Sequence, residues 1–302
     1  MNKESNKYIF LYSIALVVLV AAVLAVASIT LKPFQQKNIE VEKKQSILHS
    51  VQKAADVKNA KNKTLYVEKE YAKYITSSFV VSTQGTKVAG DAFEISLEEE
   101  FSKPLAKRRL PVFVCTEDDG SKKYILPVRG VGLWGPLWGY IALQNDYSTI
   151  YGVVFDHKGE TPGLGAEIST PKFQEQFAGK QIFEGTTFTS ILVAKGGGTQ
   201  GKPHEVDAIS GGTITSKGLE EMLSNSLSAY QNFFKEEKQK QEKAAAAVAE
   251  KEEGKKVEKK KEAQPAPKPA PKPVVVDTAA SAPAAEVAQP EAAPVAADSS
   301  TN

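Results

Sequence analysis

Residues 210–216, Ser-Gly-Gly-Thr-Ile-Thr-Ser, place four hydroxyl side chains and two glycines directly before an amphipathic stretch. Such a loop offers free backbone N–H groups and the positive end of a helix dipole, which together suit a phosphate group. Ser and Thr are also the preferred residues for capping the start of a helix. The residue types alone therefore leave two interpretations open, a phosphate-binding site and a plain helix cap.

A second cluster, residues 160–165, reads Glu-Thr-Pro-Gly-Leu-Gly. Its small residues would let the backbone approach a flat ligand closely. An ordinary Pro-Gly turn has the same composition. Ligand contact and simple chain reversal both remain open for this segment.

Two glycine patterns resemble nucleotide-binding motifs and fail on inspection. Residues 196–202 match a P-loop up to Lys202, but Pro203 follows, which has no hydroxyl for Mg²⁺ and no backbone N–H for phosphate. Residues 130–135 have the Gly-x-Gly-x-x-Gly spacing, but Pro136 and another strand-like run follow where a helix should begin. This second pattern predicts a tight turn whose tryptophans pack the domain or line a flat, π-rich ligand.

Other chemistry is poorly supported. The three histidines (His49, His157 and His204) have no metal-ligand spacing, and the single Cys115 lies in an apolar strand-like run where a thiol is inert. The formal net charge of +2 gives no footprint for nucleic acid. We therefore predict no metal site and no catalytic residue of the chain's own.

Residues 8–31 contain no charged side chain. As a helix, these 24 residues span about 36 Å, enough to cross a hydrocarbon core of about 30 Å. A cleaved signal peptide has a shorter apolar core of about 7–15 residues, so a membrane anchor is favoured. Lysines are more numerous after the span than before it, which by the positive-inside rule would place the main domain in the cytoplasm.

The composition divides the chain into five parts. We expect a short N-terminal segment at 1–7, the span at 8–31, a helical stalk or linker at 32–73, a main domain at 74–235 and a low-complexity tail at 236–302. The tail has no aromatic residue and cannot form a packed core. A solvated spacer is its expected role, and docking to a partner is the alternative.

The main domain alternates strand-like runs with turn signals, which predicts an α+β fold with a mainly antiparallel sheet. A short helix should begin at Pro171, and a longer amphipathic helix should follow Gly212. The expected strands are 79–82, 110–115, 124–128, 140–143, 149–155 and 189–194.

Together, these features resemble the C subunits of sodium-translocating NADH:quinone reductases, a family whose FMN-binding domain is shared with the G subunit of the Rnf electron-transport complex. The matching segments lie within residues 5–235 and comprise the apolar anchor with Leu31-Lys32-Pro33-Phe34-Gln35-Gln36, the tryptophan block 132–140, His157 with 160–165, and 210–215. The tryptophan block and the stalk favour the sodium pump over Rnf.

The resemblance implies a flavin cofactor. In that family the final threonine of the motif Ser-Gly-Ala-Thr-x-Thr carries FMN through a phosphoester, which here implies Thr215. Gly212 stands where the family usually has Ala. A separate flavin transferase attaches the group from FAD, so the acid–base chemistry is expected to belong to that enzyme.

The resemblance also implies ring contacts at Thr161 and Leu164, and more weakly at Trp138 or Tyr140. The remaining expected cofactor-binding residues come from the same two motifs: Ser210, Gly211, Gly212, Thr213, Glu160 and Gly163.

The implied activity is one-electron relay between NADH-derived electrons and quinone within a larger membrane complex. The expected partners are the other subunits, the flavin transferase and the lipid bilayer. Because the family's modification occurs outside the cytoplasm, the resemblance implies a bacterial inner-membrane protein with a cytoplasmic N-terminus and an extracytoplasmic main domain, against the lysine count. The alternatives are the G subunit of an Rnf-type complex and, in another class, a non-catalytic anchored scaffold protein.

Overall fold

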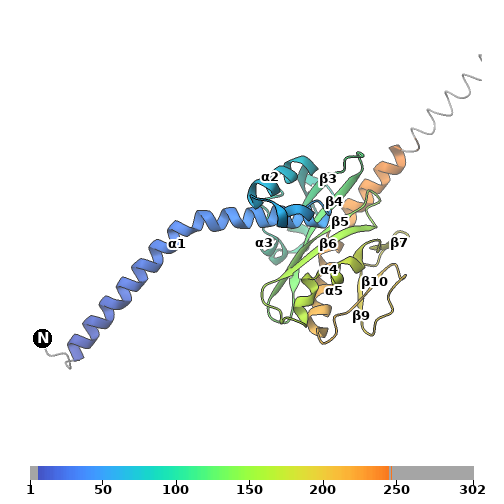
Figure 1. The fold of residues 1–302 in the computed structure, drawn as a ribbon. Coiled ribbons are helices and arrows are strands. Elements are labelled where there is room, and N and C mark those ends of the chain that lie inside the picture. The colour runs from blue at the N-terminus through green and yellow to red at the C-terminus, as the bar shows by residue number, and fades with distance from the viewer. Residues whose placement is uncertain (1–5, 245, 247–302) are drawn as a thin grey trace, which may run out of the picture. The chain divides into compact units, whose positions relative to one another are not determined.

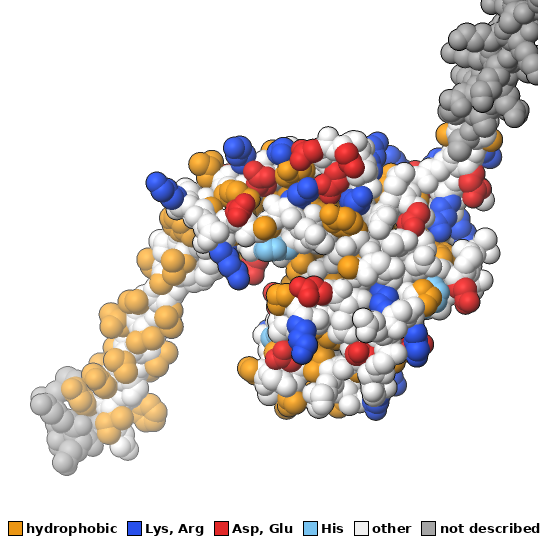
Figure 2. All heavy atoms as spheres, turned by 45° about the vertical axis from the view of Figure 1, so that its right-hand side comes forward, with side chains coloured by type: hydrophobic (Ala, Val, Ile, Leu, Met, Phe, Trp, Pro, Cys, Tyr) orange, Lys and Arg blue, Asp and Glu red, His pale blue; other side chains and the backbone are white. Residues whose placement is uncertain are grey.

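Helix α1 (Asn6–Ser50) contains the whole predicted span in the computed structural model, which describes residues 6–244 and 246. It is the one helix among those residues that is long and apolar enough to cross a membrane. Its large apolar side chains between Ile9 and Leu31 are exposed, and they cover this part of the helix in Figure 2. The described part of the chain therefore offers them no protein environment, as expected of a lipid-facing segment.

A six-stranded sheet with the order β2–β1–β3–β4–β5–β6 forms the centre of the domain, and each neighbouring pair is antiparallel. This confirms the α+β class with a mainly antiparallel sheet. The strands are β1 (Ile75–Ser82), β2 (Lys87–Val88), β3 (Arg109–Thr116), β4 (Lys122–Val131), β5 (Pro136–Leu143) and β6 (Ile150–His157).

One face of the sheet packs against helix α5 (Thr213–Ser228), which begins at the predicted position. Leu219, Met222, Leu223 and Leu227 of its apolar stripe are buried there. The chain is helical again over 231–244. The rest of this layer consists of η3 (Gly165–Ser169), α4 (Pro171–Gln174), η4 (Glu175–Phe177), β7 (Phe183–Glu184), β8 (Thr187–Phe188), β9 (Leu192–Ala194) and β10 (Glu205–Asp207).

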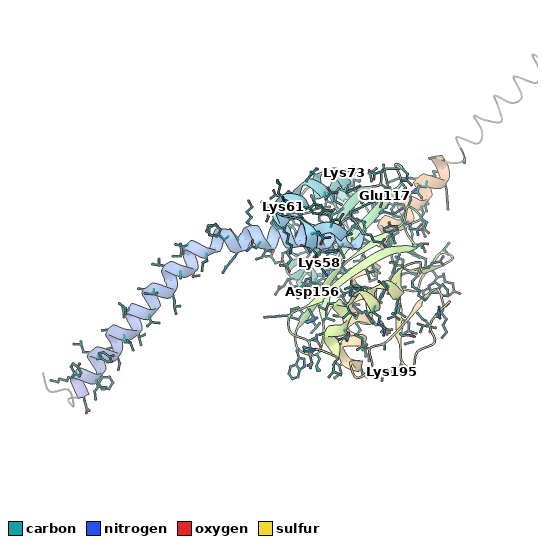
Figure 3. The ribbon with its side chains drawn as sticks, viewed as in Figure 1. Lys58, Lys61, Lys73, Glu117, Asp156 and Lys195 are labelled. Atoms are coloured by element: carbon teal, nitrogen blue, oxygen red, sulfur yellow. The ribbon has the colours of Figure 1, made fainter. Side chains whose placement is uncertain are left out.

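The opposite face packs against the C-terminal part of α1, together with η1 (Ala55–Asn59) and α2 (Lys63–Tyr74). Val41, Ile47 and Leu48 of α1 are buried with Val67 of α2. The stretch expected to be a stalk thus joins the core from Val41 onward, because its scattered apolar residues fall on one helical face. Lys58, Lys61 and Lys73 lie on this layer (Figure 3).

The tail prediction falls mostly on residues outside the described part of the chain, which ends at 246. Cys115 is buried within β3, and burial raises the pKa of its thiol to about 12. The thiol is therefore protonated at neutral pH, as the inert interpretation requires.

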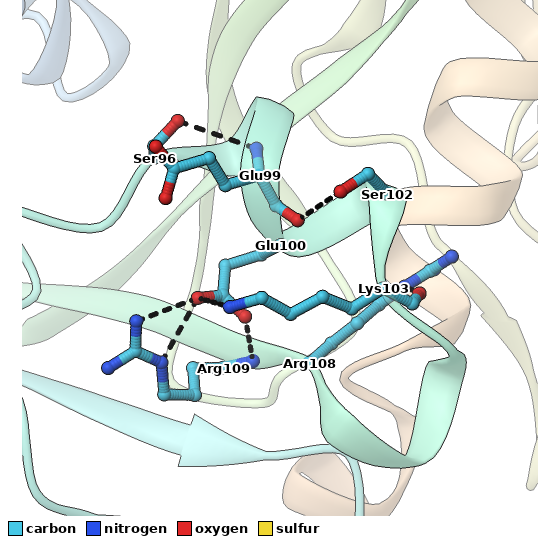
Figure 4. Close-up of polar contacts among 7 residues, drawn as sticks. All are labelled: Ser96, Glu99, Glu100, Ser102, Lys103, Arg108 and Arg109. Carbon is cyan, nitrogen blue, oxygen red and sulfur yellow. Dashed lines mark hydrogen bonds and ion pairs between the residues drawn. The ribbon is translucent and has the colours of Figure 1, made fainter.

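A buried carboxylate joins helix α3 (Leu97–Ser102) to the start of β3, and η2 (Leu105–Lys107) lies between them in sequence (Figure 4). Glu100 accepts hydrogen bonds from the backbone N–H and the guanidinium of Arg109 and from the ammonium of Lys103, at 2.8–3.0 Å. Burial alone would raise the pKa of Glu100, but these donors outweigh it and hold the pKa below its ordinary value.

We predict that Glu100→Gln lowers the free energy of unfolding by about 2 kcal/mol at pH 7, because the charged donors lose their acceptor. Glu100 has a lowered folded-state pKa, so its contribution is present above the ordinary pKa of 4.5 and is lost as the pH falls through the folded value. The difference from wild type should shrink in acid. Denaturant unfolding from pH 7 to pH 3 measures it, with exposed Glu99→Gln as the control.

Candidate functional site

Three segments that are distant in sequence meet at one end of the sheet. They are the β4–β5 turn, the loop that follows β6 and the first turn of α5. Val131 pairs with Pro136 across the hairpin, and the N–H of Gly132 donates to the carbonyl of Gly135 at 2.7 Å. The Gly-x-Gly-x-x-Gly pattern is therefore a tight hairpin turn, as predicted.

Thr215 and Glu160 form the centre of this meeting point. The hydroxyl of Thr215 donates to Oε2 of Glu160 at 2.5 Å, and the two residues are only 1% and 4% exposed. A hydrogen bond to a carboxylate is short and strong compared with one between neutral groups. The structure thus brings together two residues from the two motifs singled out in the sequence, 55 positions apart.

The Glu160 carboxylate is held by the hairpin turn as well. Its Oε1 accepts from the backbone N–H of Trp134 at 2.8 Å. The backbone N–H of Glu160 donates to Nδ1 of His157 at 3.1 Å, which places the imidazole proton on Nε2. His157, which has no metal-ligand spacing in the sequence, orients the loop that carries Glu160.

Glycines make this contact sterically feasible. A Cβ at Gly165 would overlap both Oε2 of Glu160 and Oγ1 of Thr215. A Cβ at Gly132 would lie 2.6 Å from Oε1 of Glu160. The sequence marked the glycines as an approach to a ligand, and here they admit a carboxylate and a hydroxyl.

Helix α5 begins without a side-chain cap. Gly212 occupies the N-cap position and Gly211 has a left-handed φ of +74°. Ser210 and Thr213 are exposed, while the Ser216 hydroxyl accepts from the N–H of Ile209 at 3.1 Å. No side chain caps the helix here, so the plain-cap interpretation of the hydroxyl loop is wrong and the first-turn N–H groups keep their capacity to bind an anion.

The N-terminal part of α5, from its second turn, also lies very close to β4. A Cβ at Gly218 would overlap the carbonyl oxygen of Val131, and one at Gly130 would overlap the Met222 side chain. These two glycines therefore let the helix reach the sheet closely enough for Thr215 to contact Glu160.

Trp138 and Tyr140 lie on the face of β5 that is turned away from α5. Side chains alternate along β5, and Leu137 and Ile141 face α5 while Tyr140 is buried with Ala142 against the opposite layer. Trp138 is two positions before Tyr140 in the same strand, so both lie on the same face of the sheet. The expected ring contact at Trp138 or Tyr140 stays a prediction that this strand geometry disfavours, and burial raises the pKa of the Tyr140 phenol.

The exposed apolar side chains near Thr215 are Trp134 and its neighbours. Exposed apolar side chains come from all three segments that meet at Thr215, and singly exposed apolar residues are common whereas a cluster indicates a binding surface. We call this set the apolar rim; it comprises Val131, Leu133, Trp134, Leu164 and Ile214.

The predicted Pro-Gly turn carries Leu164 to the rim. The carbonyl of Thr161 accepts from the N–H groups of Leu164 and Ala166, both at 3.1 Å, and Gly163 has φ +73°. Leu164 in turn lies over Gly211, where a Cβ would meet its Cδ2 at 2.6 Å. Thr161 and Gly163 are exposed beside it.

The P-loop-like segment is a separate surface loop. Lys202 pairs with Glu205 at 2.8 Å, and Lys180 donates to the carbonyls of Thr199 and Lys202. No helix follows it, because β10 begins at Glu205. Lys195, which precedes the loop, lies far from Lys61 in Figure 3. A cavity of about 800 Å³ between this loop and α4 is lined by Asp207 to Ile209 but does not include Thr215.

Among the described residues, no cluster of three or more His, Cys, Asp or Glu side chains is arranged to hold a metal ion. The site is therefore built of one carboxylate, one hydroxyl, an uncapped helix start and an apolar rim.

Comparison with known proteins identifies the same region. Residues 132–228 match the family model described as the FMN-binding domain. The C subunit of the Na(+)-translocating NADH-quinone reductase from Neisseria meningitidis serogroup B is 33% identical over 72% of this chain and 88% of that protein. The corresponding C subunit from Vibrio anguillarum is 29% identical over 72% of this chain and 89% of its own length.

Two solved structures share the fold. The crystal structure of the C subunit of this reductase from Parabacteroides distasonis is 46% identical, covers 68% of this chain and 96% of that one, and has a TM-score of 0.60. NqrC from Shewanella oneidensis is 28% identical with a TM-score of 0.56, and the match covers 66% of this chain and 97% of that one.

We predict that Gly165→Ala lowers the free energy of unfolding by about 1–3 kcal/mol, since the new methyl group must push Glu160 and Thr215 apart. Gly159→Ala is the matched control, because a Cβ there meets nothing within 4 Å. Its expected change is within about 0.5 kcal/mol. Denaturant unfolding of both variants tests the packing, and equal stabilities would contradict it.

Proposed function

Because the chain belongs to the family of C subunits of the Na(+)-translocating NADH-quinone reductase, we propose that it carries FMN as a phosphoester on Thr215. These C subunits are FMN-binding parts of an enzyme complex. In this proposal the flavin relays single electrons between the NADH-oxidising and quinone-reducing parts of the complex. The chain's own task is to hold the group, exclude water and tune its surroundings.

The observation that carries the proposal is the uncapped start of α5 at a buried hydroxyl. Thr215 is the third residue of a 16-residue helix, and Gly212 leaves the first-turn N–H groups without a side-chain acceptor. A phosphoester at Thr215 would place its negative charge at the positive end of the helix dipole. Gly211 and Gly163 keep the neighbouring backbone small enough for a ligand to approach.

The apolar rim supports the same proposal for the ring. Leu164 lies in the loop that carries Glu160, Trp134 lies in the hairpin turn that binds Glu160, and Ile214 precedes Thr215. A flat heteroaromatic group would cover these exposed side chains and remove their apolar surface from water. Thr161 lies in the same turn as Leu164 and remains a proposed contact.

Exposure alone would favour Thr213 as the attachment point, because its side chain is exposed while Thr215 is buried. Chemistry favours Thr215, since it is the one hydroxyl among residues 210–216 that donates to a carboxylate. Attachment at Thr215 requires the turn at 161–165 to withdraw from it, and that turn is built mostly from exposed residues around Gly163.

The anchor fits this assignment. We propose that the span in α1 holds the domain beside the other subunits in a bacterial inner membrane, with the N-terminus in the cytoplasm and the domain outside it. The maturation partner is a flavin transferase that uses FAD. The lysines that follow the span oppose this orientation by charge count, but that rule weakens when a large domain follows a single span.

We predict that Thr215→Val abolishes flavin attachment, because valine has the shape of threonine without the nucleophilic oxygen. Thr213→Val is the matched control two residues away and should reduce labelling less. Both are measured after co-expression with a flavin transferase, by intact mass and in-gel flavin fluorescence.

Labelling that survives Thr215→Val would move the attachment site. If the wild-type chain gains no FMN while a known carrier is labelled in parallel, covalent attachment is refuted.

A further inference from the structure

Glu160 is the buried acidic group whose presence the proposed function does not yet explain. Its side chain is almost fully buried, and an ionised carboxylate in such a place is costly unless its charge is compensated. The compensation comes from two donors, the backbone N–H of Trp134 on Oε1 and the hydroxyl of Thr215 on Oε2. Neither donor carries a positive charge.

The protein devotes several residues to this arrangement. Gly165 and Gly132 lack the Cβ that would displace the carboxylate, Gly218 lets α5 approach, and His157 fixes the loop through the backbone of Glu160. If the only requirement were to tie the loop to α5, a neutral side chain would satisfy it without the cost of a buried charge.

The direction of the hydrogen bond is chemically informative. Thr215 donates its proton to Glu160, so the lone pairs of Oγ1 remain free for bond formation. A hydroxyl is a weak nucleophile, and the usual means of activating it is an adjacent base at about 2.6–3.2 Å. The contact of 2.5 Å between Thr215 and Glu160 lies just below the short end of this range.

We propose that Glu160 is the proton acceptor for flavin attachment to Thr215, so that this chain supplies part of the chemistry of its own modification. The proposal rests on the proposed function. As the Oγ1–H bond breaks, its proton passes to Oε2 of Glu160, and Oγ1 bonds to the FMN-side phosphorus of a flavin dinucleotide. The P–O bond to the other phosphate breaks, and its electron pair leaves with AMP.

The same proton transfer resolves an electrostatic conflict. A phosphoester on Thr215 carries a negative charge, and an ionised Glu160 beside it would repel that charge. Once Glu160 holds the proton it is neutral, and its O–H is able to donate to the phosphoester oxygen. This carboxyl group is therefore compatible with both the free and the modified threonine.

The test compares Glu160→Gln with wild type in the full-length chain, purified in detergent without flavin. A purified flavin transferase and FAD are added, and the initial labelling rate is measured by intact mass and in-gel fluorescence from pH 5 to pH 9. Glutamine preserves the volume and can accept from Trp134 while donating to Thr215, so it removes proton acceptance with little change in shape.

We expect Glu160→Gln to slow labelling by about 10²–10⁴-fold, the usual contribution of a positioned base, and to change the pH profile of the rate. Glu167→Gln, on neighbouring η3, should label at the wild-type rate with the wild-type profile. A folded Glu160→Gln variant that labels within about twofold of wild type would overturn the proposal.

A second variant keeps the test decisive if Glu160→Gln does not fold. Glu160→Asp retains the carboxylate but withdraws it by one methylene, so it should label more slowly than wild type and faster than any neutral variant. A folded Glu160→Asp variant that labels no faster than a folded neutral variant, Glu160→Ala, would overturn the role of Glu160. Failure of the wild-type chain itself to be labelled is a different result, because it refutes attachment at Thr215 and the present proposal together.

Discussion

The hydrogen bond between Thr215 and Glu160 is the constraint on which the rest of the site depends. It fixes the start of α5 against the loop after β6, and the other oxygen of Glu160 fixes the β4–β5 turn through Trp134. Three segments separated by long stretches of chain are thereby held by one carboxylate. Glycines at 130, 132, 165 and 218 stand where a side chain would separate these segments.

The two faces of the sheet do different work. On one face, the end of α1 and the helix α2 cover the strands with a packed apolar layer, which joins the C-terminal part of α1 to the domain. On the other, α5 covers the sheet with its apolar stripe and leaves its N-terminus at the edge. The anchor helix and the site therefore meet the same sheet without competing for the same surface.

Much of this could be predicted from local sequence. The expected strands of the central sheet and the helix after Gly212 follow from periodicity, and the hydroxyl loop stands out because glycines and hydroxyls cluster before an amphipathic stripe. The Glu160 contact could not be predicted from spacing, because residues 55 positions apart meet only through the tertiary packing of α5.

Two expectations depend on which face of an element meets the rest of the fold. Trp138 and Tyr140 are aromatic residues near a glycine turn, which favours ring contacts, but the strand parity of β5 points both away from α5. The sequence of β5 itself indicates which face packs against α5. Leu137 and Ile141 alternate with Trp138 and Tyr140, and they pack with the apolar stripe of α5. The burial of Val41 within the expected stalk could not be read from that stretch, because the partner surface that buries it comes from elsewhere in the fold.

The most direct test is the location of the flavin on the mature protein. Tryptic fragments of the chain labelled by a transferase and FAD can be sequenced by tandem mass spectrometry with fragmentation that retains the phosphoester. We predict FMN on the fragment that ends at Lys217, on Thr215 alone. FMN on Thr213 or Ser210, or on any other fragment, would contradict the central role of Thr215.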